Sequence, residues 1–314
     1  MSLPFLQNYL GLSTGLQTMQ ASTGGSGATI GVFGGGSTGS YSNVMDYITI
    51  ATTGNATDFG DLTVSRHDLA GCNSDVRGIS GGGYTGSYSN VMDYITIATT
   101  GNATDFGDLT SVRGYLAGCN SDVRGVFGGG LTPSSSNIID YITIATTGNA
   151  TDFGDLTVVM ANMAGCNSSV RGILSGGATN VLVNFIDYIT IATTGNATDF
   201  GDMTVARYSH AAFNSSVRGI FAGGEESGAT SNVIDYITIA TTGNATDFGD
   251  LTVTRSYMGG GSSNVRGFIG GGYTTGYVVS NVIDYVTIAT TGNAIDFGDL
   301  TVSREGTSVM QNGL

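Results

Sequence analysis

The stretch DYITIATTGNA at residues 93–103 occurs six times in this chain, and one copy differs by a single Ile-to-Val change. The copies begin at Asp46, Asp93, Asp140, Asp187, Asp235 and Asp284, at spacings of 47, 47, 47, 48 and 49 residues. A fixed period of this length is typical of proteins in which every copy is one supersecondary unit. The chain is therefore predicted to be an array of six like units.

Each unit is predicted to contain four short strands. The clearest is 90–99, where Val91 and Ile95 alternate with Met92 and Tyr94. Alternate residues of a strand point to opposite faces, so this strand is apolar on both faces and needs cover on both. In the same unit, the other candidate strands are 66–73, 77–81 and 104–112.

The ends of the chain indicate how the units are arranged. The first unit begins near Ala28 with only its second, third and fourth strands, and residues 303–312 resemble an isolated first strand. Four-stranded antiparallel units stacked face to face around a ring form a β-propeller. We therefore predict an all-β, six-bladed propeller at 28–314, closed by the C-terminal strand completing the N-terminal blade, with an extension at 1–27. The predicted blades are 28–64 plus 303–312, 65–111, 112–158, 159–205, 206–253 and 254–302.

Composition excludes several classes of function. The net charge is −14, and all ten basic residues are arginine, so a nucleic-acid partner is not expected. No run is long enough to span a membrane, and residues 1–20 lack the basic start of a signal peptide. Cys72, Cys119 and Cys166 occupy one equivalent repeat position, which predicts free thiols rather than disulfides.

The order of glycines, Asp-Tyr, an aromatic residue and arginine resembles the kelch repeat of β-propellers. In the second unit the matching residues are Gly82, Gly83, Asp93, Tyr94, Phe106 and Arg113. Phe106 stands where kelch units usually carry Trp. The consensus wording NVIDYITIATTGNATDFGDLTVSR also resembles tandem repeats in virion proteins of marine tailed phages. That resemblance implies a phage structural or adhesion protein, located in the virion and assembled in the host cytoplasm.

The polar motifs repeat around the array, which favours structural roles. Asp-Phe-Gly recurs six times without a lysine-bearing kinase context, so it is interpreted as a turn whose Phe packs between blades. Two periodic sets of five arginines suggest Arg–Asp bridges or bonds to loop carbonyls. Catalysis needs one asymmetric constellation, and we predict no catalytic residue, no metal site and no cofactor. Calcium at the Asp-rich turns stays an open alternative.

The units differ most in the loop that follows the glycines. Equivalent loops of a propeller emerge on one face, and a rigid scaffold with varied loops is a common way to build a binding surface. The candidate binding residues are Tyr41, Tyr84, Tyr88, Leu131, Pro133, Val181, Phe185, Glu225, Glu226, Tyr273 and Tyr277.

The N-terminal extension carries a partly helical apolar stripe, which we predict to dock onto other virion proteins. The stripe consists of Leu3, Phe5, Leu6, Tyr9, Leu10 and Leu16. The sequence thus predicts a non-enzymatic virion protein, either a head decoration or a tail-associated adhesin, which contacts protein or glycan, including a host surface receptor. The alternative is a carbohydrate-binding or glycosidase-like propeller of the sialidase type.

Overall fold

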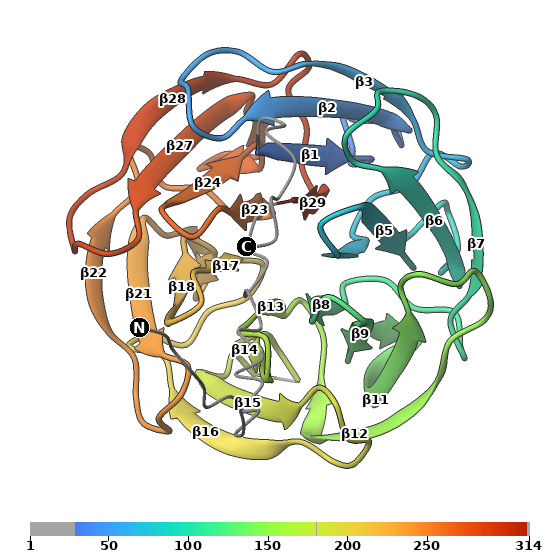
Figure 1. The fold of residues 1–314 in the computed structure, drawn as a ribbon. Coiled ribbons are helices and arrows are strands. Elements are labelled where there is room, and N and C mark those ends of the chain that lie inside the picture. Colours follow the sequence, from blue (N-terminus) through green and yellow to red (C-terminus); the bar gives the residue numbers. More distant parts are fainter. Residues whose placement is uncertain (1–28, 180, 313–314) are drawn as a thin grey trace, which may run out of the picture.

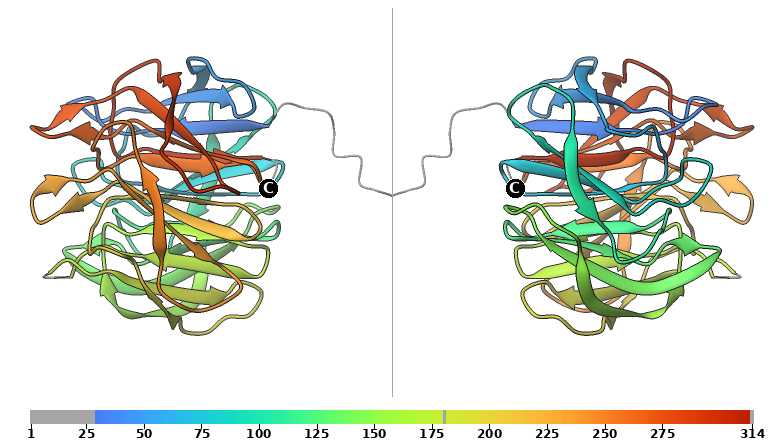
Figure 2. Two further views of the ribbon diagram at one scale, coloured as in Figure 1. Left: turned by 90° about the vertical axis from the view of Figure 1, so that its left-hand side faces the viewer. Right: turned by 90° about the vertical axis from the view of Figure 1, so that its right-hand side faces the viewer.

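The computed structural model describes residues 29–179 and 181–312, and these residues form an all-β ring without helices. Six four-stranded antiparallel sheets surround a central axis as blades (Figure 1). Seen from two sides, the ring is a short, thick cylinder (Figure 2). The predicted six-bladed β-propeller is confirmed.

The second blade shows the common pattern. From the axis outward it contains β4 (Ala70–Asn73), β5 (Arg77–Gly81), β6 (Val91–Thr96) and β7 (Thr104–Asp108). The first strand is shorter than the predicted 66–73, because residues 66–69 form the turn that leads into the blade.

The other blades repeat this order. The first blade contains β1 (Ile30–Gly34), β2 (Val44–Thr49), β3 (Thr57–Asp61) and β29 (Ser308–Gln311). The third contains β8 (Ala117–Asn120), β9 (Arg124–Gly128), β10 (Leu131–Thr132), β11 (Ser134–Thr143) and β12 (Thr151–Met160). The fourth contains β13 (Ala164–Asn167), β14 (Arg171–Ser175), β15 (Phe185–Thr190) and β16 (Thr198–Asp202).

The last two blades add a short hairpin to the four strands. The fifth contains β17 (Ala211–Asn214), β18 (Arg218–Ala222), β21 (Val233–Thr238) and β22 (Thr246–Asp250), with the hairpin β19 (Glu225–Glu226) and β20 (Ala229–Thr230). The sixth contains β23 (Gly259–Ser262), β24 (Arg266–Gly270), β27 (Val282–Thr287) and β28 (Ile295–Asp299), with the hairpin β25 (Tyr273–Thr274) and β26 (Val278–Val279).

The ring closes as the split first unit predicted. Strand β29 pairs antiparallel with β1, with Gly31 opposite Gln311 and Gly34 opposite Ser308. In Figure 1 the red end of the chain lies beside the blue beginning of the fold. The N–H of Ile30 donates to the Asn312 side chain at 2.7 Å. The first blade is thus built from both ends of the described chain.

The Asp-Phe-Gly motif lies in the outermost strand of each blade rather than in a turn. Phe106 on β7 packs in an apolar cluster with Ile142 and Ile144 of the third blade. Gly107 has a φ of 140° and opposes a β-bulge at Met92. A Cβ on Gly107 would lie 2.5 Å from a carbonyl oxygen of the third blade, so the glycine permits close blade contact. The predicted packing of Phe between blades is confirmed.

One set of arginines is fully buried. Arg66 donates to the Asp93 carboxylate of the second blade at 2.9 Å and to the Ser80 carbonyl at 3.1 Å. Equivalent ion pairs join Arg113 to Asp140, Arg207 to Asp235, Arg255 to Asp284, and Arg304 to Asp46. In the fourth unit Met160 occupies the equivalent position. The suggested Arg–Asp bridges are present, and they lie in the core rather than on the surface.

The second set of arginines joins neighbouring blades. The guanidinium of Arg77 lies 4.6 Å from the centroid of the Tyr94 ring and donates to the Ala145 carbonyl of the third blade at 3.0 Å. In the sixth blade, Arg266 makes the same contacts with Tyr285 and the Ala51 carbonyl of the first blade, across the closure. The three cysteines are buried and free, as predicted.

Candidate functional site

The six variable loops lie on one face of the ring, here called the top face. In the second blade, Tyr84 of such a loop forms a β-bridge with His67, which lies on the segment leading into the innermost strand β4. The equivalent bridges pair Ser37 with Glu305, Gly114 with Leu131, Ala161 with Ala178, Tyr208 with Glu225, and Ser256 with Tyr273. Each loop is therefore held beside the entry to the axis.

A closed ring of backbone hydrogen bonds surrounds the axis at the top face. Tyr115 donates its N–H to the carbonyl of Asp68 at 2.8 Å, and each further member donates to the preceding blade until Asp68 donates to Gly306 at 2.9 Å. The members are Asp68, Tyr115, Asn162, Ser209, Tyr257 and Gly306, and all six have φ between 53° and 63°. This left-handed backbone is uncommon for residues other than Gly, Asn and Asp.

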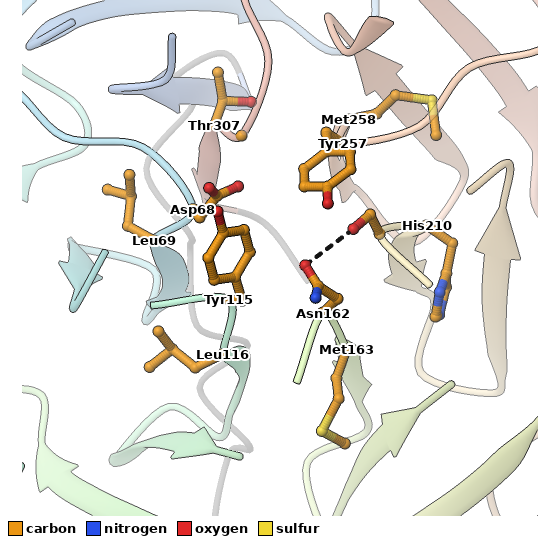
Figure 3. Close-up of a pocket in the computed structure, with 12 residues that line it drawn as sticks. Asp68, Leu69, Tyr115, Leu116, Asn162, Met163, His210, Tyr257, Met258 and Thr307 are labelled. Atoms are coloured by element: carbon orange, nitrogen blue, oxygen red, sulfur yellow. Dashed lines mark hydrogen bonds between the residues drawn. The ribbon is translucent and has the colours of Figure 1, made fainter. Parts of the chain in front are cut away.

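Below this ring lies an axial pocket of about 80 Å³ (Figure 3). It is lined by the six ring members and by the residues that follow them, Leu69, Leu116, Met163, His210, Met258 and Thr307. The carboxyl group of Asp68 and the rings of Tyr115 and Tyr257 face the open centre (Figure 3). A side-chain hydrogen bond also joins neighbouring blades, from the Ser209 hydroxyl to the Asn162 side chain at 3.2 Å.

A continuous chain of aromatic rings crosses the top face and passes over the axial pocket. We call it the aromatic arc. Its members, in order of contact, are Tyr88, Tyr84, Tyr41, His67, Tyr115, Tyr257, Tyr273 and Tyr277, with Tyr208 beside Tyr257. Tyr115 and Tyr257 meet across the pocket with ring centroids 6.4 Å apart. The arc thus joins the predicted loop tyrosines of both sides of the ring into one surface.

Carboxylates flank the arc at the first and second blades. His67 Nδ1 lies 2.5 Å from Asp68 Oδ2. Burial alone would lower the pKa of His67. The hydrogen bond to Asp68 and the negative charges of Asp68 and Glu305 together outweigh burial, so the pKa of His67 is raised. Burial, and then the charge of Asp68, raises the pKa of Glu305. Burial and Asp68 likewise raise the pKa of the Tyr115 hydroxyl, which therefore stays protonated and able to donate.

A second acidic contact lies at the fifth and sixth blades. The Tyr273 hydroxyl donates to Glu225 Oε2 at 2.7 Å. Burial is the largest cause that raises the pKa values of Tyr208 and Tyr273, and hydrogen bonding to Glu225 raises both further. Glu226, the next residue, is half-buried in β19. On this side of the arc, Tyr208 and Tyr273 are therefore neutral phenols that interact with the Glu225 carboxylate.

The variable loops of the third and fourth blades contain no tyrosine. Leu131 is half-buried in β10, and Pro133 is exposed beside it. Val181 is 67% exposed. Phe185, predicted as a loop residue, begins strand β15 and is 40% exposed there. None of these four residues contacts the arc tyrosines through an aromatic ring pair, so the top face is chemically two-sided.

Several residues of the site were missed by the sequence reasoning. They are His67, Asp68, Tyr115, Tyr208, Tyr257 and Glu305. All lie just after the first-set arginine position, where the units read HDL, GYL, ANM, YSH, SYM and EGT. These three residues differ from unit to unit, and the difference is visible in the sequence. The expectation of no enzyme was based on polar residues being nearly identical in all units, which does not hold at these positions.

Two further observations concern metals and membranes. Within residues 29–179 and 181–312, no group of three or more His, Cys, Asp or Glu side chains is arranged to hold a metal ion. In the same part of the chain, no helix is long and apolar enough to cross a membrane. The predicted docking residues lie outside the described residues; they are Leu3, Phe5, Leu6, Tyr9, Leu10 and Leu16.

Comparison with known proteins supports the fold. No protein-family model and no curated protein matches the sequence. A solved structure titled "Structure of YjhT" matches with a TM-score of 0.66 and 11% sequence identity, over 79% of this chain and 88% of that chain. At this identity the likeness shows the fold alone.

Proposed function

We propose that the protein is a non-enzymatic carbohydrate-binding propeller whose aromatic arc forms the ligand platform. The arc is the observation that carries this proposal, because it gathers tyrosines from five of the six units beside three carboxylates. The apolar face of a sugar ring packs on an aromatic ring, while the sugar hydroxyls bond to phenols and carboxylates.

A glycan array tests this function directly. Tyr84→Ala and Tyr273→Ala remove one ring from each side of the arc, and each is expected to weaken binding up to about tenfold, because an aromatic contact contributes about 0.5–1.5 kcal/mol. Phe185→Ala is the matched control, since it removes an exposed aromatic side chain that lies outside the arc. Failure of the wild-type protein to bind any glycan would reject the proposal.

The sialidase-type alternative has less support from the side chains. Its chemistry requires clustered arginines that contact an anionic sugar. The first-set arginines that lead toward the top face are fully buried and paired with aspartates, apart from the fourth unit, which has Met160. The second set stacks on tyrosine rings and bonds to carbonyls of the next blade. An acidic, aromatic surface instead favours a neutral or cationic ligand.

A hydrolase of another type is the second candidate function. Burial, and then the charge of Asp68, raises the pKa of Glu305, and two neighbouring carboxyl groups are the arrangement used for glycoside hydrolysis. Hydrolysis of aryl glycosides by the wild-type protein, lost in Glu305→Gln, would establish an enzyme. Stable binding without turnover is the outcome that our non-enzymatic proposal expects.

The proposed setting is a phage virion, in which the propeller is a head decoration or tail adhesin. This setting is supported by the amino-acid sequence of the repeat, which resembles tandem repeats in virion proteins of marine tailed phages. Mass spectrometry of purified particles should detect the protein, and deletion of residues 1–25 should yield a folded ring that no longer joins the particles. Normal incorporation of the truncated protein would reject the docking role of the N-terminal segment.

A further inference from the structure

The size of the axial pocket limits what enters it. Its volume is about 80 Å³, and on the same measure a site for one water molecule needs roughly 10–15 Å³. The pocket therefore has room for a group of a few heavy atoms. A ligand that lies along the arc can place one substituent in the pocket.

The charges around the pocket are acidic. Asp68 is 8% exposed, and its carboxyl group points into the pocket (Figure 3). Glu305 lies close enough for the charge of Asp68 to act on it. The one basic group that the structure pairs with Asp68 is His67. Because the nearby Arg66 and Arg304 are fully buried and paired with other aspartates, they offer no free cation to an anionic substituent.

The walls of the pocket suit a cation. Tyr115 and Tyr257 line the pocket, their rings meet edge to face at an interplanar angle of 80°, and an aromatic face attracts organic cations. Thr307 lines the pocket and has a buried hydroxyl without a hydrogen-bond partner among the described residues. That hydroxyl can accept a hydrogen bond from a donor group on the ligand.

Gly306 keeps the carboxylate accessible. It is the one glycine among the six members of the backbone ring, and a Cβ at this position would lie 2.7 Å from Asp68 Oδ1. Any larger residue would therefore cover the oxygen. The other five members have a similar φ without being glycine, so the φ of 63° at Gly306 does not by itself explain why glycine occurs here.

From these contacts we propose that the axial pocket binds the ammonium group of a non-acetylated amino sugar. Asp68 accepts its hydrogen bonds, and Tyr115 and Tyr257 pack against it. The inference rests on the proposed carbohydrate-binding function and names the substituent that gives it specificity. An N-acetyl group lacks the charge, and a carboxylate is repelled by Asp68 and Glu305.

Calorimetric titration with two disaccharides at about pH 7 tests the inference. The probes are the β-1,4 dimer of glucosamine and its N,N′-diacetyl form, which differ in the amino groups. We expect the free amine to bind about tenfold more tightly or better, as a charge-assisted hydrogen bond predicts. Asp68→Asn should reduce this preference to about twofold or less, and Asn tolerates the left-handed φ of this position.

The controls separate this site from general attraction to an acidic protein. Asp122→Asn removes one exposed carboxylate from the turn between β8 and β9, on the opposite face, and should leave the preference unchanged. Gly306→Ala should abolish the preference by covering Asp68. Should Asp68→Asn not fold, Glu305→Gln provides the same test with an expected loss of about threefold.

Three results would overturn the inference. They are equal affinity for both disaccharides, an equal loss of preference in Asp122→Asn and Asp68→Asn, or binding of neither probe by a protein that binds other glycans on the array. In the last case the carbohydrate-binding function still stands. Absence of binding to every glycan rejects both proposals.

Discussion

The second and fourth blades share one frame but differ at the buried position of the first arginine set. In the second, the guanidinium of Arg66 neutralises Asp93 in the middle of the blade. In the fourth, Met160 replaces the arginine, and Asp187, which is 1% exposed, accepts hydrogen bonds from the Thr157 N–H at 3.0 Å and hydroxyl at 2.8 Å. A repeat that looks uniform therefore holds one carboxylate without its cation.

The difference shows how the repeat tolerates a missing charge. Burial raises the pKa of Asp187, while its bonds to Thr157 oppose the shift. Met160 is fully buried in the apolar cluster between the third and fourth blades. Its backbone extends β12 and pairs with Ser136 of a lengthened β11. The fourth unit thus replaces an ion pair with apolar packing and a longer hairpin.

The largest expected effect comes from copying the fourth unit into the second. Arg66→Met leaves Asp93 buried and unpaired, and removal of one partner of a buried ion pair lowers stability by about 3–5 kcal/mol. The free energy of unfolding in urea at about pH 7 measures this loss. The substitution does not bring with it the lengthened β11–β12 hairpin that contains Met160. The second blade therefore gains no contacts that compensate for the loss of the ion pair.

The double variant Arg66→Met/Asp93→Asn is the matched control. It removes the uncompensated charge and should recover most of the lost stability, because the neutral Asn side chain can still accept the hydrogen bond from the Thr63 N–H. Equal losses in the single and double variants would show that the arginine acts through its bonds to carbonyls rather than through Asp93.

The second effect concerns the carboxylate that already lacks an arginine. Asp187→Asn keeps an acceptor for Thr157 and removes the buried charge, so it should stabilise the protein at about pH 7 by about 1–2 kcal/mol. Asp93→Asn in the second blade should do the opposite, since it strands the buried Arg66. Urea unfolding of both variants measures the contrast.

The pH dependence of Asp187→Asn has a definite sign. The pKa of Asp187 is raised in the folded state, so the folded protein holds its proton more tightly than the unfolded chain. The destabilisation that the charge of Asp187 causes is absent below the pKa of the unfolded chain, about 3.9, and it grows as the pH rises to the pKa in the folded state. The advantage of the asparagine variant should therefore increase with pH across that window. An advantage that grows toward low pH would contradict this account.

Periodicity predicted most of the fold. The six copies of DYITIATTGNA and the split first unit led to the blade number and the closure, because each copy buries the same faces. The axial site was harder to find. Tyr41 and Tyr273 stand far apart in the sequence, and only ring closure brings their loops to one face. The left-handed turn that presents Asp68 has no motif of its own, although its divergence among the units was visible.

The smallest effect concerns the second arginine set, whose members are half-exposed. In the first unit Ile30 replaces this arginine and packs beside Tyr47, so the frame tolerates its absence. Arg77→Lys keeps the charge over Tyr94 but loses the planar donor geometry toward Ala145. It should lower stability by no more than about 1 kcal/mol, as measured by urea unfolding. A loss as large as that of Arg66→Met would mean that the contact between blades, rather than the buried charge within them, dominates the stability of the ring.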